Sequence, residues 1–177
     1  MADIRDRVKE DRGILKTIQM YIPGFRGYRI REDLRDSDRM LRAQMSKLLK
    51  AQRQGMEESR ELVQDFTSPQ LDNIGRVINN FKKIERAVEH ADVGYSGISA
   101  DVRIKEDEIN RLYEFDASLI DDINAMSWGV QRLKTALDNG DKSEAEMEIK
   151  AVKSALSQFD TTFKKRKLVI TGTEVSE

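Results

Sequence analysis

The sequence has no cysteine and a single histidine, His90, among its 177 residues. Thiol nucleophiles, cysteine-ligated zinc, iron–sulfur clusters and metal sites built from several histidines are therefore excluded. A lone histidine without a nucleophile elbow gives no support to a serine-hydrolase triad. We expect His90 near the end of a helix, where a cation interacts favourably with the helix dipole. These absences predict a non-enzymatic protein with no cofactor.

The sequence also lacks long apolar runs and a strong charge of either sign. No apolar stretch approaches the roughly 20 residues needed to span a bilayer, and the N-terminus opens with charged residues rather than with a secretory signal. Charged residues make up 36% of the chain, but the two signs are interleaved and the net charge is -1. That mixture is typical of solvated helix faces. We expect a cytoplasmic protein with no nucleic-acid partner.

Proline is scarce as well, and its two occurrences, Pro23 and Pro69, are expected to mark helix boundaries because proline breaks the ladder inside a helix. Weaker breaks are expected at two glycine-containing turns, 94–97 and 138–141. Apolar periodicity between these breaks predicts five helices. They span about 3–22, 29–66, 70–92, 102–138 and 142–167.

Within these segments, apolar residues recur at alternating steps of three and four, as in a coiled coil. The clearest apolar stripe comprises Ile109, Leu112, Leu119, Ile123, Met126, Val130, Leu133 and Leu137. All five helices need a helical partner, and short connections favour antiparallel neighbours. The predicted fold class is an all-α, elongated, up-and-down antiparallel bundle of about five helices. Residues 1–167 form its single domain, and the tail 168–177 packs back, pairs as a short strand or stays flexible.

Carboxylates occupy four positions in the stripes where an apolar residue is expected: Asp11, Asp38, Glu85 and Asp116. One interpretation is a carboxylate-lined metal site with three of them as ligands: Asp38, Glu85 and Asp116. The Glu-x-x-His step of di-iron bundles is missing around His90. The favoured interpretation is that the acids pair with nearby arginines and fix helix register. Candidate partners are Arg35, Arg42 and Arg86, and we assign no metal.

Two turns combine glycines with aromatic or apolar residues that ordinary exposed turns do not need: 21–28 and 94–98. If the helices alternate in direction, both turns lie at the same end of the bundle. Aromatic residues and arginines are the side chains that dominate interface hot spots. The sequence thus predicts an interaction or scaffold protein that binds a protein partner through this end. The predicted partner-binding residues are Phe25, Arg26, Tyr28, Arg29 and Tyr95.

Several alternatives stay open at this stage. Arg26 and Arg29 precede a basic helix start and could instead bind a small anion. The segment 3–22 could lie on a membrane surface, although acids interrupt its basic face and favour packing against the bundle. Self-association into a homo-oligomer is a further alternative.

The stretch from Tyr21 to Arg42 contains Ile-Pro-Gly-Phe-Arg-Gly-Tyr, followed by Arg31, Glu32, Arg35, Asp38, Leu41 and Arg42. It resembles a group of uncharacterised prokaryotic helical-bundle proteins. A second point of resemblance is Gly94 to Gly97 together with Leu112, Tyr113, Glu114 and Asp116. The resemblance implies a prokaryotic, cytoplasmic protein and brings no activity or catalytic residue. In architecture alone, the chain is distantly similar to membrane-remodelling helical-hairpin proteins of the phage-shock type.

Overall fold

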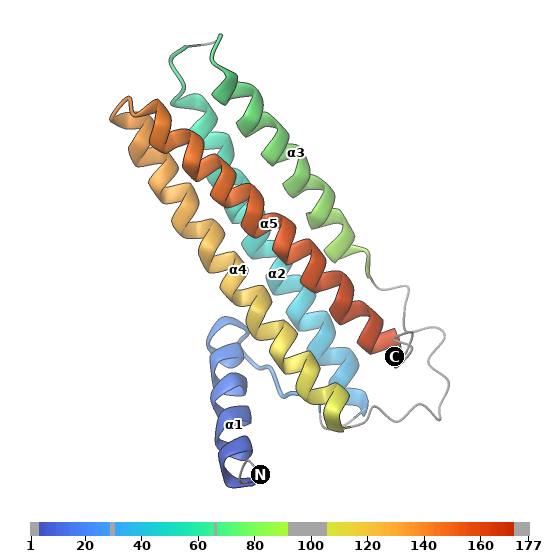
Figure 1. Ribbon diagram of the computed structural model, residues 1–177. Coiled ribbons are helices and arrows are strands. Elements are labelled where there is room, and N and C mark those ends of the chain that lie inside the picture. The colour runs from blue at the N-terminus through green and yellow to red at the C-terminus, as the bar shows by residue number, and fades with distance from the viewer. Residues whose placement is uncertain (1–3, 29–30, 66, 92–105, 172–177) are drawn as a thin grey trace.

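A computed structural model of the chain describes residues 4–28, 31–65, 67–91 and 106–171. The described residues form five helices and no strand, which confirms the all-α bundle (Figure 1). The helices are α1 (Ile4–Tyr21), α2 (Arg31–Glu61), α3 (Pro69–Glu89), α4 (Glu106–Asp138) and α5 (Lys142–Thr171). Their bounds lie close to those predicted from apolar periodicity.

The last four helices pack as two antiparallel hairpins, α2–α3 and α4–α5, laid side by side (Figure 1). Between the hairpins, α2 lies against α4 and α3 lies against α5. Both of these contacts are parallel, so α3 and α5 begin at the same end, where Gln70 donates a 2.7 Å hydrogen bond to the carbonyl of Lys142. From α2 to α5 the helix direction therefore alternates as predicted, and each of these four helices has one antiparallel and one parallel neighbour.

The connections between paired helices follow the signals in the sequence. Pro69 is the first residue of α3, and the hydroxyl of Ser68 caps the helix by accepting a 3.3 Å hydrogen bond from the backbone N–H of Gln70. At the end of α4, Gly140 has a φ of 71°, which favours glycine. The backbone N–H of Asp141 then bonds back to Ala136 at 2.9 Å, closing the helix in a Schellman-type turn.

The predicted apolar stripes form the core. The stripe of α4 is buried from Leu112 to Leu133. The corresponding stripe of α5, from Ala145 to Phe163, is buried throughout. The buried stripe residues of these two helices include Leu112, Leu119, Ile123, Met126, Val130, Leu133, Ala145, Ile149, Val152, Leu156, Phe159 and Phe163. Two glycines allow neighbouring helices to pack closely, Gly129 at the α4–α5 interface and Gly55 at the α2–α4 interface. A Cβ on Gly129 would lie 2.7 Å from Val152, and one on Gly55 would lie 2.6 Å from Val130.

Helix α1 departs from the alternating pattern. It runs in the same general direction as α4 and meets that helix at its own C-terminal end, where Tyr21 is hydrogen-bonded to Asn124 (Figure 1). The chain then doubles back, because Gly24 and Gly27 adopt φ values of 84° and 92°, a region of backbone space that favours glycine. This reversal brings Tyr28 back to the level of the first turns of α4. The turn after α1 thus lies on the side of the bundle.

Helix α5 is longer than the periodicity predicted. It continues past residue 167 to Thr171, and Val169 and Ile170 are buried. Of the three fates considered for the tail, residues 168–171 pack back as the last turn of α5. Residues 172–177 lie outside the described part of the chain.

Candidate functional site

The most distinctive polar feature of the molecule is Arg166, a fully enclosed arginine on α5 with 1% of its surface exposed. Its guanidinium donates three hydrogen bonds: Nε to Asp116 Oδ1 at 2.6 Å, Nη1 to Asp38 Oδ1 at 2.5 Å, and Nη2 to the Tyr28 hydroxyl at 2.9 Å. The planar guanidinium presents several donors in fixed directions, which suits this three-way arrangement. We call these four residues the Arg166 cluster. They join α5 to α2, to α4 and to the connection between α1 and α2.

A second layer of contacts holds the cluster in place. Arg42 donates from Nε to the other oxygen of Asp38 at 2.7 Å, and the Tyr28 hydroxyl donates to Asp116. The backbone N–H of Tyr28 donates to the hydroxyl of Tyr113 at 3.2 Å, and the two rings lie 5.2 Å apart. The turn after α1 is therefore fixed to α4 and α5 through both the backbone and the side chain of Tyr28.

Burial and charge act against each other in the cluster. Burial raises the pKa of Asp116 above its ordinary value, although Arg166 and the Tyr28 hydroxyl favour the ionised form. For Asp38, burial is outweighed by Arg166 and Arg42, and the pKa is lowered. Burial also raises the pKa of Tyr28 well above its ordinary value, so the phenol stays neutral. Two carboxylates and two guanidiniums then balance one another, as buried charges require.

The carboxylates considered as metal ligands do not converge. Asp38 and Asp116 both bind Arg166, whereas Glu85 accepts a 2.8 Å hydrogen bond from Arg53 of α2. Among the described residues, no group of three or more histidines or acids is arranged to hold a metal ion. The interpretation that the acids pair with arginines is confirmed for all three, with Arg42 as one predicted partner.

Two of the arginine partners, Arg166 and Arg53, were not predicted. A signal for Arg166 was present, because the apolar stripe of α5 continues from Phe163 by a step of three to this residue. Because the predicted helix ends at residue 167, Arg166 falls within the basic run 164–167, which is expected at a solvated helix end. For Arg53, two positions before the Gly55 contact, the sequence gives no comparable signal.

The predicted partner-binding residues are only partly on the surface. Phe25 and Tyr28 are 2% and 3% exposed, so their prediction as surface contact residues is wrong. The doubled-back turn directs both rings inward, where they meet edge-to-face at 5.3 Å. Arg26, between them in the same turn, is exposed. Arg29 and Tyr95 lie outside the described residues.

Large apolar side chains are exposed where α1 stops covering α4. Trp128 is 63% exposed and lies one helical turn beyond Asn124, the residue that is hydrogen-bonded to Tyr21. Met20, next to Tyr21 at the end of α1, is 76% exposed. We call Met20, Arg26 and Trp128 the α1-end surface. The sequence pattern could not single it out, because its definition depends on where α1 ends against α4.

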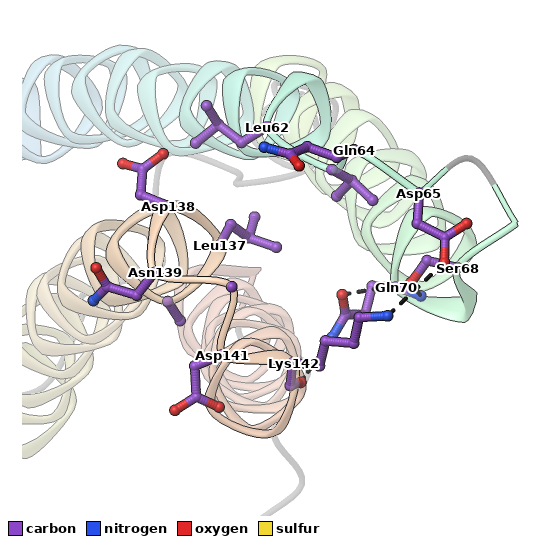
Figure 2. A pocket seen from close by; sticks show the side chains of 13 residues that line it. Leu62, Gln64, Asp65, Ser68, Gln70, Leu137, Asp138, Asn139, Asp141 and Lys142 are labelled. Atoms are coloured by element: carbon purple, nitrogen blue, oxygen red, sulfur yellow. Dashed lines mark hydrogen bonds and ion pairs between the residues drawn. The ribbon is translucent and has the colours of Figure 1, made fainter.

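A hollow of about 420 Å³ lies between the α2–α3 and α4–α5 connections, at the end of the bundle where α3 and α5 begin. In Figure 2, Leu62 and Leu137 lie on one side of it and Gln70 and Lys142 on another. Its rim includes three acids, Asp65, Asp138 and Asp141. This hollow adjoins a second one between the first turns of α3 and α5. Both were unpredicted, since they depend on the parallel placement of those helices.

Comparison of the chain with protein-family models, with curated proteins and with solved structures finds no match. Among the described residues, no helix combines the length and the apolar character required to cross a membrane. The arguments about function therefore rest on the geometry of the chain itself.

Proposed function

We propose that this protein is a non-enzymatic, cytoplasmic interaction or scaffold protein that binds a protein partner through the α1-end surface. The observation that carries the proposal is the 63% exposure of Trp128. Tryptophan offers a large, rigid contact area, and it is the residue type most typical of interface hot spots. In α4 it lies one helical turn beyond Asn124, to which Tyr21 at the end of α1 is hydrogen-bonded.

The composition of the surface supports this role. Met20 adds a flexible apolar side chain that adapts to irregular partners, and Arg26 adds a charged group of the kind enriched at interfaces. The apolar residues that a free amphipathic α1 would offer to a membrane are used elsewhere, since Ile18 and Ile22 are buried in the bundle. A protein partner is therefore favoured over membrane contact.

The buried carboxylates support a structural role for the Arg166 cluster. Asp38 and Asp116 are 2% and 0% exposed, and each is paired with a guanidinium. The cluster holds the turn after α1 in register and thereby fixes the position of the α1-end surface. Positioning by a rigid buried network is what a defined recognition surface needs.

The test is affinity purification of the tagged protein from its own organism, with mass spectrometry of the retained proteins. The variant Trp128→Ala combined with Met20→Ala is expected to lose a stoichiometric partner, because truncation of hot-spot residues costs about 2 kcal/mol or more of binding free energy. Met147→Ala is the matched control: Met147 is a 60% exposed methionine on α5 and its loss should leave the partner bound. Retention of every specific partner by the double variant would overturn the proposal.

The same variants address self-association. If the partner is a second copy of the chain, sedimentation velocity should show an oligomer for the unmodified protein and a monomer for the Trp128→Ala, Met20→Ala variant. A change of equal size in the Met147→Ala control would place the contact elsewhere.

A further inference from the structure

A groove runs between α3 and α5 on a different face from the α1-end surface. It consists of two hollows, of about 650 Å³ at the start of the two helices and about 130 Å³ further along. The hollows adjoin, since Asn73 of α3 and Glu146 of α5 line both. Val77 and Ile149, which are 1% and 3% exposed, line the second hollow and give it an apolar floor. The groove is thus elongated along the helix axes, polar at its sides and apolar at its base.

Two acids in the groove have basic partners. Asp65 lies 3.8 Å from the ammonium group of Lys142, and Glu146 lies 3.1 Å from that of Lys150. These pairs are exposed and each approximately neutralises its acid.

Two further cations line the second hollow, Arg76 from α3 and Lys153 from α5. Within the described part of the chain, neither has an ion-pair partner. The groove therefore has an excess of positive charge in a chain whose net charge is -1. An anionic ligand would be attracted to it by charge complementarity.

We propose that this groove binds an acidic peptide segment of a partner protein, with Arg76 and Lys153 pairing its carboxylates. The elongated shape accommodates several residues of a peptide, whose apolar side chains would contact Val77 and Ile149. Asn73, which lines both hollows, supplies an amide that would hydrogen-bond the peptide backbone. This second surface is independent of Trp128, so the proposal goes beyond the function argued above.

A nucleic acid is a poorer match for the groove. Stable binding to a phosphate backbone typically uses about 6–10 contacts from basic side chains, whereas the groove offers two cations without carboxylate partners. A single inorganic phosphate held by Arg76 and Lys153 would sit in the second hollow and would leave the 650 Å³ hollow empty.

The experiment screens a displayed library of 12-residue peptides rich in aspartate, glutamate and apolar residues against the full chain. Fluorescence anisotropy of the enriched peptides then compares three proteins: the unmodified chain, the variant Arg76→Glu with Lys153→Glu, and a control variant. The control, Lys47→Glu with Lys50→Glu, makes the same change of net charge on exposed positions of α2. Circular dichroism checks that all three have the same helix content and melting temperature.

The expected result is enrichment of acidic peptides whose affinity falls about tenfold or more in the groove variant and about twofold or less in the control, since the reversed charges repel carboxylates. Trp128→Ala alone, with the groove intact, should leave the affinity of these peptides unchanged. Failure to enrich any peptide, or equal losses in the groove variant and the control, would overturn the proposal. Full displacement of the peptides by low millimolar inorganic phosphate would also overturn it, in favour of a phosphate site.

Discussion

Arg166 and Asp116 are 50 positions apart in the sequence, and the guanidinium Nε of the first donates a 2.6 Å hydrogen bond to the second in the interior of the bundle. Both side chains are almost fully buried. Such a pair has a large desolvation cost, which is offset only while each charge keeps its partner. The same guanidinium binds Asp38 and Tyr28, so the loss of one residue would leave two buried acids without their main counter-charge.

We therefore expect Arg166→Met to lower the free energy of unfolding by about 3–5 kcal/mol, the cost of an uncompensated buried charge. Combining it with Asp38→Asn and Asp116→Asn should recover part of that loss, because the isolated charges are then removed. Urea denaturation measures both. Lys150→Met is the matched control, since Lys150 pairs with Glu146 on the surface of α5 and exposed pairs contribute about 0–1 kcal/mol. Equal losses for Arg166→Met and Lys150→Met would show that the cluster contributes little to stability.

Two helical glycines should respond to alanine in opposite directions. At Gly129 the added Cβ would lie 2.7 Å from Val152 of α5, and overpacking typically costs about 1–3 kcal/mol. At Gly75 of α3 nothing lies within 4 Å of the added Cβ, so Gly75→Ala should stabilise the protein by up to about 1 kcal/mol through helix propensity. Thermal denaturation of the two variants should give melting temperatures on either side of that of the unmodified chain. A rise for Gly129→Ala would contradict the close α4–α5 packing.

Much of the fold was predictable because local periodicity determines which face of each helix is buried. The stripes of α4 and α5 occupy the core as expected, and Pro69 and Gly140 mark the helix ends that their backbone preferences predict. What periodicity cannot specify is which helices become neighbours. The parallel contacts of α2 with α4 and of α3 with α5 depend on how two complete hairpins pack, and the groove between α3 and α5 follows from that choice.

The candidate site was harder to predict for a related reason. Aromatic residues in a glycine-rich turn are compatible with an exposed contact surface or with a turn that folds inward, and the sequence does not distinguish the two. The φ values of Gly24 and Gly27 decide the outcome by directing Phe25 and Tyr28 into the core. Trp128 lies outside the apolar stripe of α4, and its 63% exposure became evident only from the structure.

Gly27→Ala should weaken the attachment of α1 specifically. Its φ of 92° disfavours any Cβ, and the added atom would lie too close to the Tyr113 hydroxyl that accepts from the backbone N–H of Tyr28. We expect a loss of about 2–4 kcal/mol from backbone conformation and steric overlap together. Hydrogen exchange should show the amides of α1 losing more protection than those of α3.

Gly140→Ala is the control for that measurement. Gly140 also has a positive φ, 71°, but nothing lies within 4 Å of an added Cβ. Its substitution should cost only the backbone contribution, about 1–2 kcal/mol, without selective loss of protection in α1. The same exchange pattern in both variants would argue against a specific role for the Gly27–Tyr113 contact.

Asp122 on α4 should make stability depend on pH in a direction opposite to ordinary acid denaturation. Its Oδ2 is buried and accepts no hydrogen bond from the groups that the structure describes, and burial, together with the neighbouring charge of Asp121, raises the pKa of Asp122 to about 6. Between the ordinary carboxyl pKa of about 4 and this value, the folded chain holds a proton that the unfolded chain has released. This group's contribution to stability therefore increases as the pH falls through 6 toward 4.

Asp122→Asn should therefore stabilise the protein at pH 7 by about 1 kcal/mol, a modest figure because solvent partly screens the half-buried carboxylate. The difference in stability between the two proteins should vanish near pH 4. Urea denaturation across pH 4–8, with Asp121→Asn as the exposed neighbour for comparison, measures this difference. A constant difference over the whole range would mean that the carboxylate is ionised throughout and that its burial has little effect.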